Sequence, residues 1–184
     1  MPGRAGGGVP DVVDDRLRRR VLWAMPSGLY VVGSAAGGRV NLMTANLAFQ
    51  VAVEPKLVGV AVDAASVTHE LVAAGGGFSL SLLAREDRAV VRRFVKPVSE
   101  DQIERRGGGG GGAVVSMAGE TVEVHATGAP VLTRAAAWLD CSLRHRLLLG
   151  SHELFVGEVV AVGGPAGDLP PLLRMEDTAM RYGG

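Results

Sequence analysis

Residues 40–68, VNLMTANLAFQVAVEPKLVGVAVDAASVT, decide how the rest of the chain is interpreted. Two apolar runs flank Glu54-Pro55, and this pattern predicts two neighbouring strands joined by a turn. The first run alternates larger apolar residues with smaller or polar ones, which is the period of a strand with two different faces. Its larger apolar residues are Leu47, Phe49, Val51 and Val53. The second run, 57–62, is apolar throughout, so we expect a strand covered on both sides.

The end of this stretch has the character of a helix start. Ser66 and Thr68 precede apolar residues at helical spacing, and a Ser or Thr in that position is a common N-cap. Free amide groups and hydroxyls at a helix N-terminus favour a phosphate. Most such residues are only caps, so both interpretations remain open. Asn41, Thr44 and Asn46 interrupt the first run with hydrogen-bonding groups that could line a site.

Upstream of this stretch we expect a helix and a hairpin. The helix begins at Asp14 with apolar residues at helical spacing, and Pro26 ends it. Residues 28–34 form a strand, and the turn 36–39 returns the chain into the central stretch.

Downstream, the helix after Thr68 ends near three glycines at 75–77. Residues 78–83, FSLSLL, predict a strand with one mostly small and polar face. Residues 86–95 start acidic and end basic, as a helix does. Six consecutive glycines make 98–112 a mobile loop, and residues 1–13 are expected to be disordered.

The last part of the chain contains further strands, including a second hairpin across Gly150-Ser151. We expect these strands at 113–116, 121–125, 138–148 and 153–162. About seven strands in succession with three helices predict a mainly β protein, an antiparallel barrel with peripheral helices. Residues 14–184 are expected to form one domain.

The composition argues against several classes of partner and site. The chain has 184 residues, and its 19 basic and 19 acidic side chains cancel, so no global charge suggests nucleic acid or an anionic membrane as partner. The single cysteine, Cys141, excludes a disulfide within the chain and a cysteine-based zinc site, and we expect a buried thiol. The N-terminus lacks the apolar core of a signal peptide, which predicts a cytoplasmic protein.

Common catalytic motifs are absent from the sequence, and its four histidines do not form a metal-binding pattern. Only His145 and His152 lie close together, so we expect no metal site. His152 begins a strand directly after a turn, where its side chain could reach over the mouth of a site. The alternative is a solvated histidine at a turn.

The order of these segments resembles the flavin reductase-like family of FMN-binding split barrels over roughly residues 16–162. The segments are MPSGLYVVGS, NLMTANLAFQVAVEPKLVGVAVD, a Ser-x-Thr helix start, FSLSLL, DRAVVRRFVKPV and GSHELFVGEVV. The resemblance implies a Greek-key split β-barrel that forms a homodimer, with FMN near the subunit interface.

The resemblance also assigns roles to residues. Residues implied to contact the flavin ring and ribityl chain are Thr44, Ala45 and Asn46. Residues implied to bind the FMN phosphate or its surroundings are Ser66, Thr68 and Arg93. Ser81 stands where many members carry Asn, and many members read Thr-Ala-Ser-Ser-Phe where this chain has TANLA at 44–48. His152 matches the histidine that lies by the flavin and the nicotinamide.

The implied activity is that of an NAD(P)H-dependent flavin reductase, with FMN or FAD as the flavin and a partner monooxygenase among the acceptors of its electrons. Two alternatives stay open at this point. One is a flavin-binding electron carrier without NAD(P)H activity, and the other is a related split barrel that binds haem or a deazaflavin.

Overall fold

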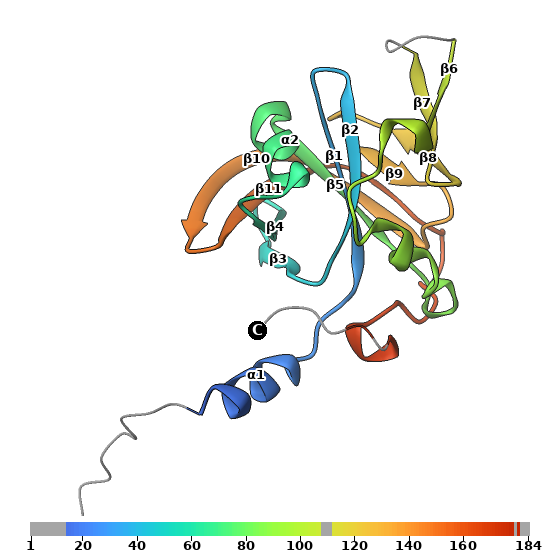
Figure 1. Ribbon diagram of the computed structural model, residues 1–184. Coiled ribbons are helices and arrows are strands. Elements are labelled where there is room, and N and C mark those ends of the chain that lie inside the picture. Colours follow the sequence, from blue (N-terminus) through green and yellow to red (C-terminus); the bar gives the residue numbers. More distant parts are fainter. Residues whose placement is uncertain (1–13, 108–111, 179, 181–184) are drawn as a thin grey trace, which may run out of the picture.

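A computed structural model describes residues 14–107, 112–178 and 180 (Figure 1). The strands are all antiparallel and form two sheets. The seven-stranded sheet has the order β2-β1-β5-β10-β11-β4-β3, and the four-stranded sheet has the order β6-β7-β8-β9. The strands of the larger sheet are β1 (Tyr30–Ala36), β2 (Arg39–Ala45), β3 (Ala48–Ala52), β4 (Leu57–Asp63), β5 (Gly77–Leu82), β10 (Ala137–Leu149) and β11 (His152–Gly163). Those of the smaller sheet are β6 (Ile103–Arg106), β7 (Ala113–Met117), β8 (Glu120–Val124) and β9 (Pro130–Leu132).

The predicted mainly β antiparallel class is confirmed. The strand pairs of the described residues do not close the larger sheet into a ring, because β2 and β3 stand at opposite ends of its order. The hairpin of β1 and β2 turns at Gly37 and Gly38, whose φ values of 55° and 80° suit a tight two-residue connection. The hairpin of β10 and β11 carries register shifts at Asp140/Cys141 and at Leu143/His145, and its strands are visibly curved in Figure 1.

Two α-helices form where the sequence predicts them. α1 (Asp15–Trp23) is capped by Asp14, and α2 (Val67–Gly75) is capped by Ser66 and ends at Gly76 in the left-handed conformation. The helix expected over 86–95 is wrong. That segment instead forms two 3₁₀ turns, η1 (Arg85–Asp87) and η2 (Val90–Phe94). The Thr44 hydroxyl donates to the Val91 carbonyl, a group that an α-helix would use to bond the amide four residues on.

The loop expected over 98–112 is shorter than the sequence indicates. Residues Glu100–Gln102 form a 3₁₀ turn, η3, and β6 follows directly and pairs with β7. β6 alternates half-buried Ile103 and Arg105 with exposed Glu104 and Arg106, a strand period that its charge conceals. Residues 1–13 and 108–111, which include the expected disordered terminus and most of the glycine run, lie outside the described residues. One further 3₁₀ turn, η4, spans Met175–Asp177.

Two apolar clusters hold these layers together. The first lies between the smaller sheet, η2 and one side of the larger sheet, and includes Leu42, Phe94, Met117 and Leu132. The second packs the larger sheet against α2 and is built from large buried side chains and the free thiol of Cys141, as predicted. Its members include Val32, Val60, Val72, Phe78 and Phe155. No helix within the described ranges is long and apolar enough to cross a membrane.

β3 lacks the clear alternation of burial that its sequence predicts, because Phe49, Gln50 and Val51 are all exposed. The larger apolar side chains of β3 and of Val53 just beyond it point outward. The exposed fractions are 53% for Phe49, 43% for Val51 and 75% for Val53. β3 is also an edge strand of the larger sheet. An exposed apolar face on an edge strand is a surface on which another chain can pack.

Candidate functional site

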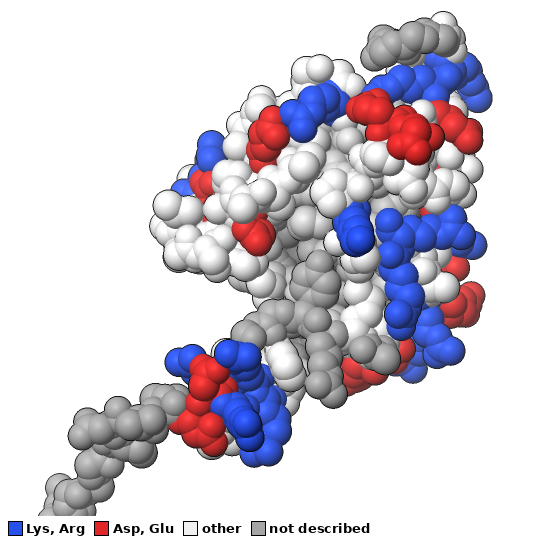
Figure 2. Space-filling model, viewed as in Figure 1, with Lys and Arg blue, Asp and Glu red and all other residues white. Residues whose placement is uncertain are grey.

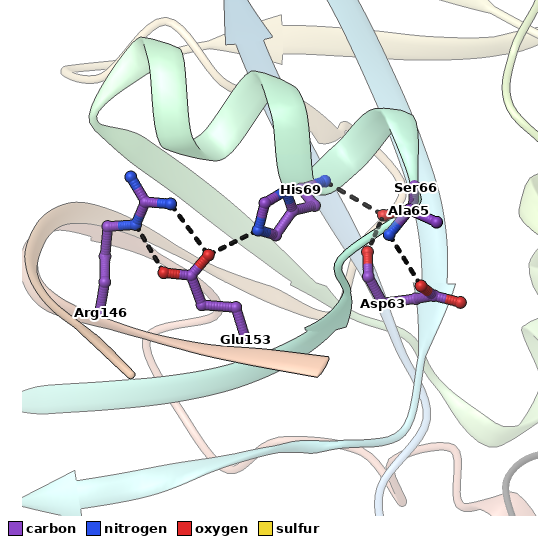
Figure 3. Close-up of polar contacts among 6 residues, drawn as sticks. All are labelled: Asp63, Ala65, Ser66, His69, Arg146 and Glu153. Carbon is purple, nitrogen blue, oxygen red and sulfur yellow. Dashed lines mark hydrogen bonds and ion pairs between the residues drawn. The ribbon is translucent and has the colours of Figure 1, made fainter. Parts of the chain in front are cut away.

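The turn from β4 into α2 forms the helix start that the sequence predicts. The Ser66 hydroxyl accepts a hydrogen bond from the His69 amide at 3.1 Å and donates one to the Asp63 carbonyl at 2.8 Å (Figure 3). The Asp63 carboxylate accepts from the Ala65 amide at 2.9 Å and fixes the turn. A helix start leaves up to four amide groups without partners in the helix, and Ser66 takes one of them. The remaining amides of this turn are suited to an anion.

Thr68 belongs to a buried hydrogen-bond chain. Its side chain is 1% exposed, and its hydroxyl accepts from the Asn41 amide group at 2.9 Å. The Asn41 side-chain oxygen in turn accepts from the Val98 backbone amide at 3.0 Å. Asn41 therefore ties β2 to both α2 and the segment that follows η2. The Thr68 hydroxyl therefore takes part in these buried hydrogen bonds, whereas the Thr68 backbone amide belongs to the first turn of the helix.

The predicted flavin-contacting residues lie at the end of β2. Thr44 is 1% exposed and donates to the Val91 carbonyl at 2.6 Å, Ala45 is buried, and Asn46 is half-buried in the turn toward β3. The Thr44 side chain thus supports the position of η2. Any contact of 44–46 with a ligand would have to use backbone groups and the Asn46 side chain.

Ser81 and Arg93 lie apart from the helix start. Ser81 is fully buried, and its hydroxyl accepts from the Leu132 amide at 3.0 Å, which fastens β5 to β9. Arg93 donates to the Ala118 carbonyl at 2.9 Å and lies 3.5 Å from a Glu120 carboxylate oxygen. Both side chains thus bond to residues of the smaller sheet or its turns. Their roles in cofactor binding stay predictions.

His152 lies beside the helix start. It pairs with Asp63 across the β11–β4 ladder, and the Ala64 amide donates to the Ser151 carbonyl at 3.0 Å. The His152 Nδ1 atom is 2.9 Å from the Ser151 hydroxyl, which orients the half-buried ring. The fold therefore brings His152 and Ser66 to the same turn although 86 positions of sequence separate them.

A charged cluster next to this turn was not anticipated from the sequence. Glu153 Oε2 lies 2.5 Å from His69 Nε2, and Arg146 donates to both carboxylate oxygens at 2.7 and 2.9 Å (Figure 3). The Arg146 guanidinium, followed by the His69 hydrogen bond, lowers the pKa of Glu153 to about 2 against the opposing effect of desolvation. The cluster joins α2 to the hairpin that carries His152. Glu153 follows His152 directly in the sequence, but nothing local points to His69.

No three His, Cys, Asp or Glu side chains converge on a metal position in the described part of the chain. Two surface cavities also lie away from the predicted site residues. One of about 360 Å³ is bounded by residues of β1, β3, β4, β5, β10 and β11 and contains none of the predicted site residues.

These features define a class: an antiparallel β protein in which a Ser-capped helix start lies beside the hairpin that carries His152. The chain belongs to the flavin reductase-like family, since the family model described as "Flavin reductase like domain" matches residues 22–183. The resemblance found in the sequence is thereby confirmed.

Known proteins agree with this assignment. The NADH-dependent flavin reductase StyB of Pseudomonas fluorescens is 28% identical over 174 residues, which cover 94% of this chain and 91% of that protein. An NADH-dependent FAD reductase of Streptomyces globisporus is 31% identical over 150 residues, 79% of this chain and 75% of that protein. The solved structure of the styrene monooxygenase flavin reductase from Pseudomonas putida S12 superposes with a TM-score of 0.67 at 25% identity, covering 86% of this chain and 91% of that one.

Some relatives are considerably longer than this chain. The matched region spans 57% of the high molecular weight rubredoxin of Moorella thermoacetica, which is 30% identical over 76% of this chain. It spans 44% and 60% of two Rhizobium meliloti relatives, a probable flavin reductase and the stachydrine N-demethylase reductase subunit Stc3.

Proposed function

We propose that this chain is an NAD(P)H-dependent flavin reductase that binds FMN, or FAD, within a single domain over 14–184. Family membership supports the reaction class, and two relatives of similar length are named NADH-dependent flavin or FAD reductases. The observation that carries the proposal is the pairing of His152 with Asp63 at the turn capped by Ser66. The β11–β4 ladder thus sets His152 next to the helix start that we propose binds an anion.

The donors at this turn fit a flavin phosphate. The first turn of α2 offers backbone amides, and the Ser66 hydroxyl lies among them. Asp63 adds a negative charge nearby, but its carboxylate already accepts from the Ala65 amide. One turn further along the helix, His69 and Arg146 face the single carboxylate of Glu153, so this side of the turn does not repel an anion.

When bound, the flavin supplies the acceptor for hydride from the nicotinamide. The residues of this chain would bind the flavin and orient the nicotinamide. Ser66 and the α2 amides hold the phosphate, and the backbone of 44–46 borders the ring. His152 orients the nicotinamide or holds a proton, and its ring is kept in place through Nδ1 by the Ser151 hydroxyl.

An absorbance titration tests the proposal. Purified protein is mixed with FMN or FAD, and NADH or NADPH is then added without oxygen. We expect a perturbed flavin spectrum that bleaches on nucleotide addition. His152→Ala should still bind flavin but oxidise NAD(P)H more slowly by about 10²- to 10⁴-fold, the range of general acid–base groups. An unchanged rate removes His152 from the mechanism.

A flavin-binding electron carrier without NAD(P)H activity is the second candidate. The match to a protein named high molecular weight rubredoxin favours it. In that case the flavin would bind with the same perturbed spectrum and would not bleach when nucleotide is added.

The proposal includes a homodimer, a partner monooxygenase and a cytoplasmic location. The outward apolar face of β3 supports a homodimer, because a second copy would remove Phe49, Val51 and Val53 from water. A monooxygenase partner is suggested by the similarity to the flavin reductase of styrene monooxygenase. Size-exclusion chromatography with light scattering tests the dimer directly.

A further inference from the structure

The larger sheet bears an apolar groove that nothing in the described chain fills. It contains the cavity of about 360 Å³, lined among others by Tyr30, Phe49, Leu139, Val159 and Val162. A second cavity of about 490 Å³ adjoins the first at Tyr30 and Leu82. The second cavity extends the groove to the segment that follows α1.

α1 is an amphipathic helix that stands away from both sheets in the part of the chain that the structure describes (Figure 1). None of its residues is buried. Leu17 and Val21 are 46% and 57% exposed, and Met25, just beyond the helix, is 65% exposed. Spacing of four residues places the three side chains along one side of a helix. Figures 1 and 2 show α1 standing apart from the two sheets, with charges of both signs on its surface.

The chain after α1 is fastened to the segment 173–175, which limits how far the helix can reach over its own copy. The Leu29 amide donates to the Leu173 carbonyl, and the Met175 amide donates to the Ser27 carbonyl, both at 3.1 Å. Gly28 pairs with Arg174 between these two bonds. Only the residues from Ala24 to Pro26 link this anchored segment to α1, a reach of roughly 10 Å, and Pro26 restricts the residue before it to extended backbone.

The exposed apolar area matches that of a dimer interface. Ten apolar side chains of α1, its end, β3 and β11 are 43% to 75% exposed: Leu17, Val21, Leu22, Met25, Leu47, Phe49, Val51, Val53, Val160 and Val162. At roughly 80 Å² each they expose about 800 Å² per copy, the area that a standard interface buries on each partner. A two-fold axis would repeat each contact reciprocally.

We propose that the α1 helix of one copy packs into the apolar groove of a second copy, and that the exchange is mutual. The inference rests on the homodimer of the proposed function and adds the element that joins the copies. It gives the exposed apolar side chains of α1 and the groove that the described chain leaves unfilled one common explanation.

A disulfide crosslink tests the exchange. Val21→Cys places a thiol on α1 and Val162→Cys places one on the groove. The native Cys141 will not interfere, because it is fully buried and burial raises the pKa of its thiol to about 12. The two single variants are co-expressed with different affinity tags and oxidised mildly. We expect a covalent dimer of twice the 19.0 kDa chain mass that contains both tags.

The double variant Val21→Cys/Val162→Cys separates exchange between copies from folding back within one. A product at 19.0 kDa with an internal disulfide, or no disulfide at all, would overturn the exchange. As a second measurement, Leu17→Glu/Val21→Glu should raise the dissociation constant of the dimer by on the order of 100-fold. Arg20→Gln, a polar position of α1, is the matched control and should leave the dimer intact.

These results also separate the exchange from the proposals on which it rests. If Leu17→Glu/Val21→Glu remains a dimer of unchanged affinity, the exchange is wrong and the homodimer stands. If the unmodified protein is a monomer, both are wrong, whereas the flavin titration decides the reductase reaction independently. Binding of the full chain to anionic vesicles that Leu17→Glu/Val21→Glu abolishes, with the dimer unaffected, would assign α1 to a membrane surface and overturn the exchange.

Discussion

Replacing Asn41 with alanine should weaken the fold and the predicted phosphate site together. Asn41 is 2% exposed. Its side chain donates to the Thr68 hydroxyl at 2.9 Å and accepts from the Val98 amide at 3.0 Å. Asn41→Ala removes both bonds and leaves a buried hydroxyl and a part-buried amide without these partners.

The expected magnitude follows from these two bonds. Each contributes about 1 kcal/mol net, and a buried polar group left without a partner costs about 1–3 kcal/mol. Because the hydroxyl can partly reorient, we expect a loss of about 2–4 kcal/mol in the free energy of unfolding. In a protein of this size that corresponds to a fall in Tm of about 5 to 15 °C.

Urea and thermal denaturation followed by circular dichroism measure this loss. Asn41→Asp keeps acceptors for the Val98 amide and the Thr68 hydroxyl but buries a carboxylate without a cationic partner in the described chain, so it should lose at least as much stability. Thr68→Val should cost only part of the Asn41→Ala loss, and the double variant should lose less than the sum of the two. A loss below about 0.5 kcal/mol for Asn41→Ala would refute the reasoning, since that is the range of unconnected surface changes.

Three further changes probe other parts of the molecule. Gly33→Ala would place a Cβ 1.9 Å from the Pro130 carbonyl oxygen, so the free energy of unfolding should fall by about 3 kcal/mol or more, or the protein should not fold. In the control Gly167→Ala, the added Cβ meets open space and Tm should stay unchanged. The pKa of Glu153 is lowered to about 2 in the folded protein, so its contribution to stability is present above the unfolded pKa near 4.5 and is lost as pH falls toward 2. Glu153→Gln should therefore flatten this part of a profile of Tm against pH. If the profiles of the variant and the unmodified protein run parallel, the ion pairs of Glu153 do not stabilise the fold. Ser66→Ala should weaken FMN binding but not riboflavin binding in a fluorescence titration, and equal weakening of both would show that Ser66 acts only as a cap.

The sequence predicts well those elements whose determinants are local. The hairpin at Gly37-Gly38 and the Ser66 cap depend on a few neighbouring residues, and both form as expected. β6 was missed because its charged side chains conceal the alternation, and only pairing with β7 makes it a strand. The 3₁₀ turn η2, in place of a helix at 86–95, is contacted by Thr44, which is distant in sequence.

In the candidate site, too, local patterns could be predicted and long-range contacts could not. Ser66 at a helix start is a local pattern, but the position of His152 next to it depends on the register between β4 and β11. His69 could not be connected with Glu153 and Arg146 from sequence, because 84 positions separate His69 from Glu153. For the same reason the outward direction of Phe49 and Val51 is invisible in the β3 pattern, which specifies two faces without saying which one meets the core.

The register shift between Leu143 and His145 makes the length of β10 part of the site. Arg144 is the extra residue there, and an extra residue bends the strand that contains it and increases its twist. The bend lies between the anchored base of the hairpin and the tip that carries Ser151 and His152. In an alignment of related sequences, a one-residue gap at Arg144 would therefore signify a straighter β10, in which the pairing of His152 with Asp63 is kept by the β11–β4 ladder alone.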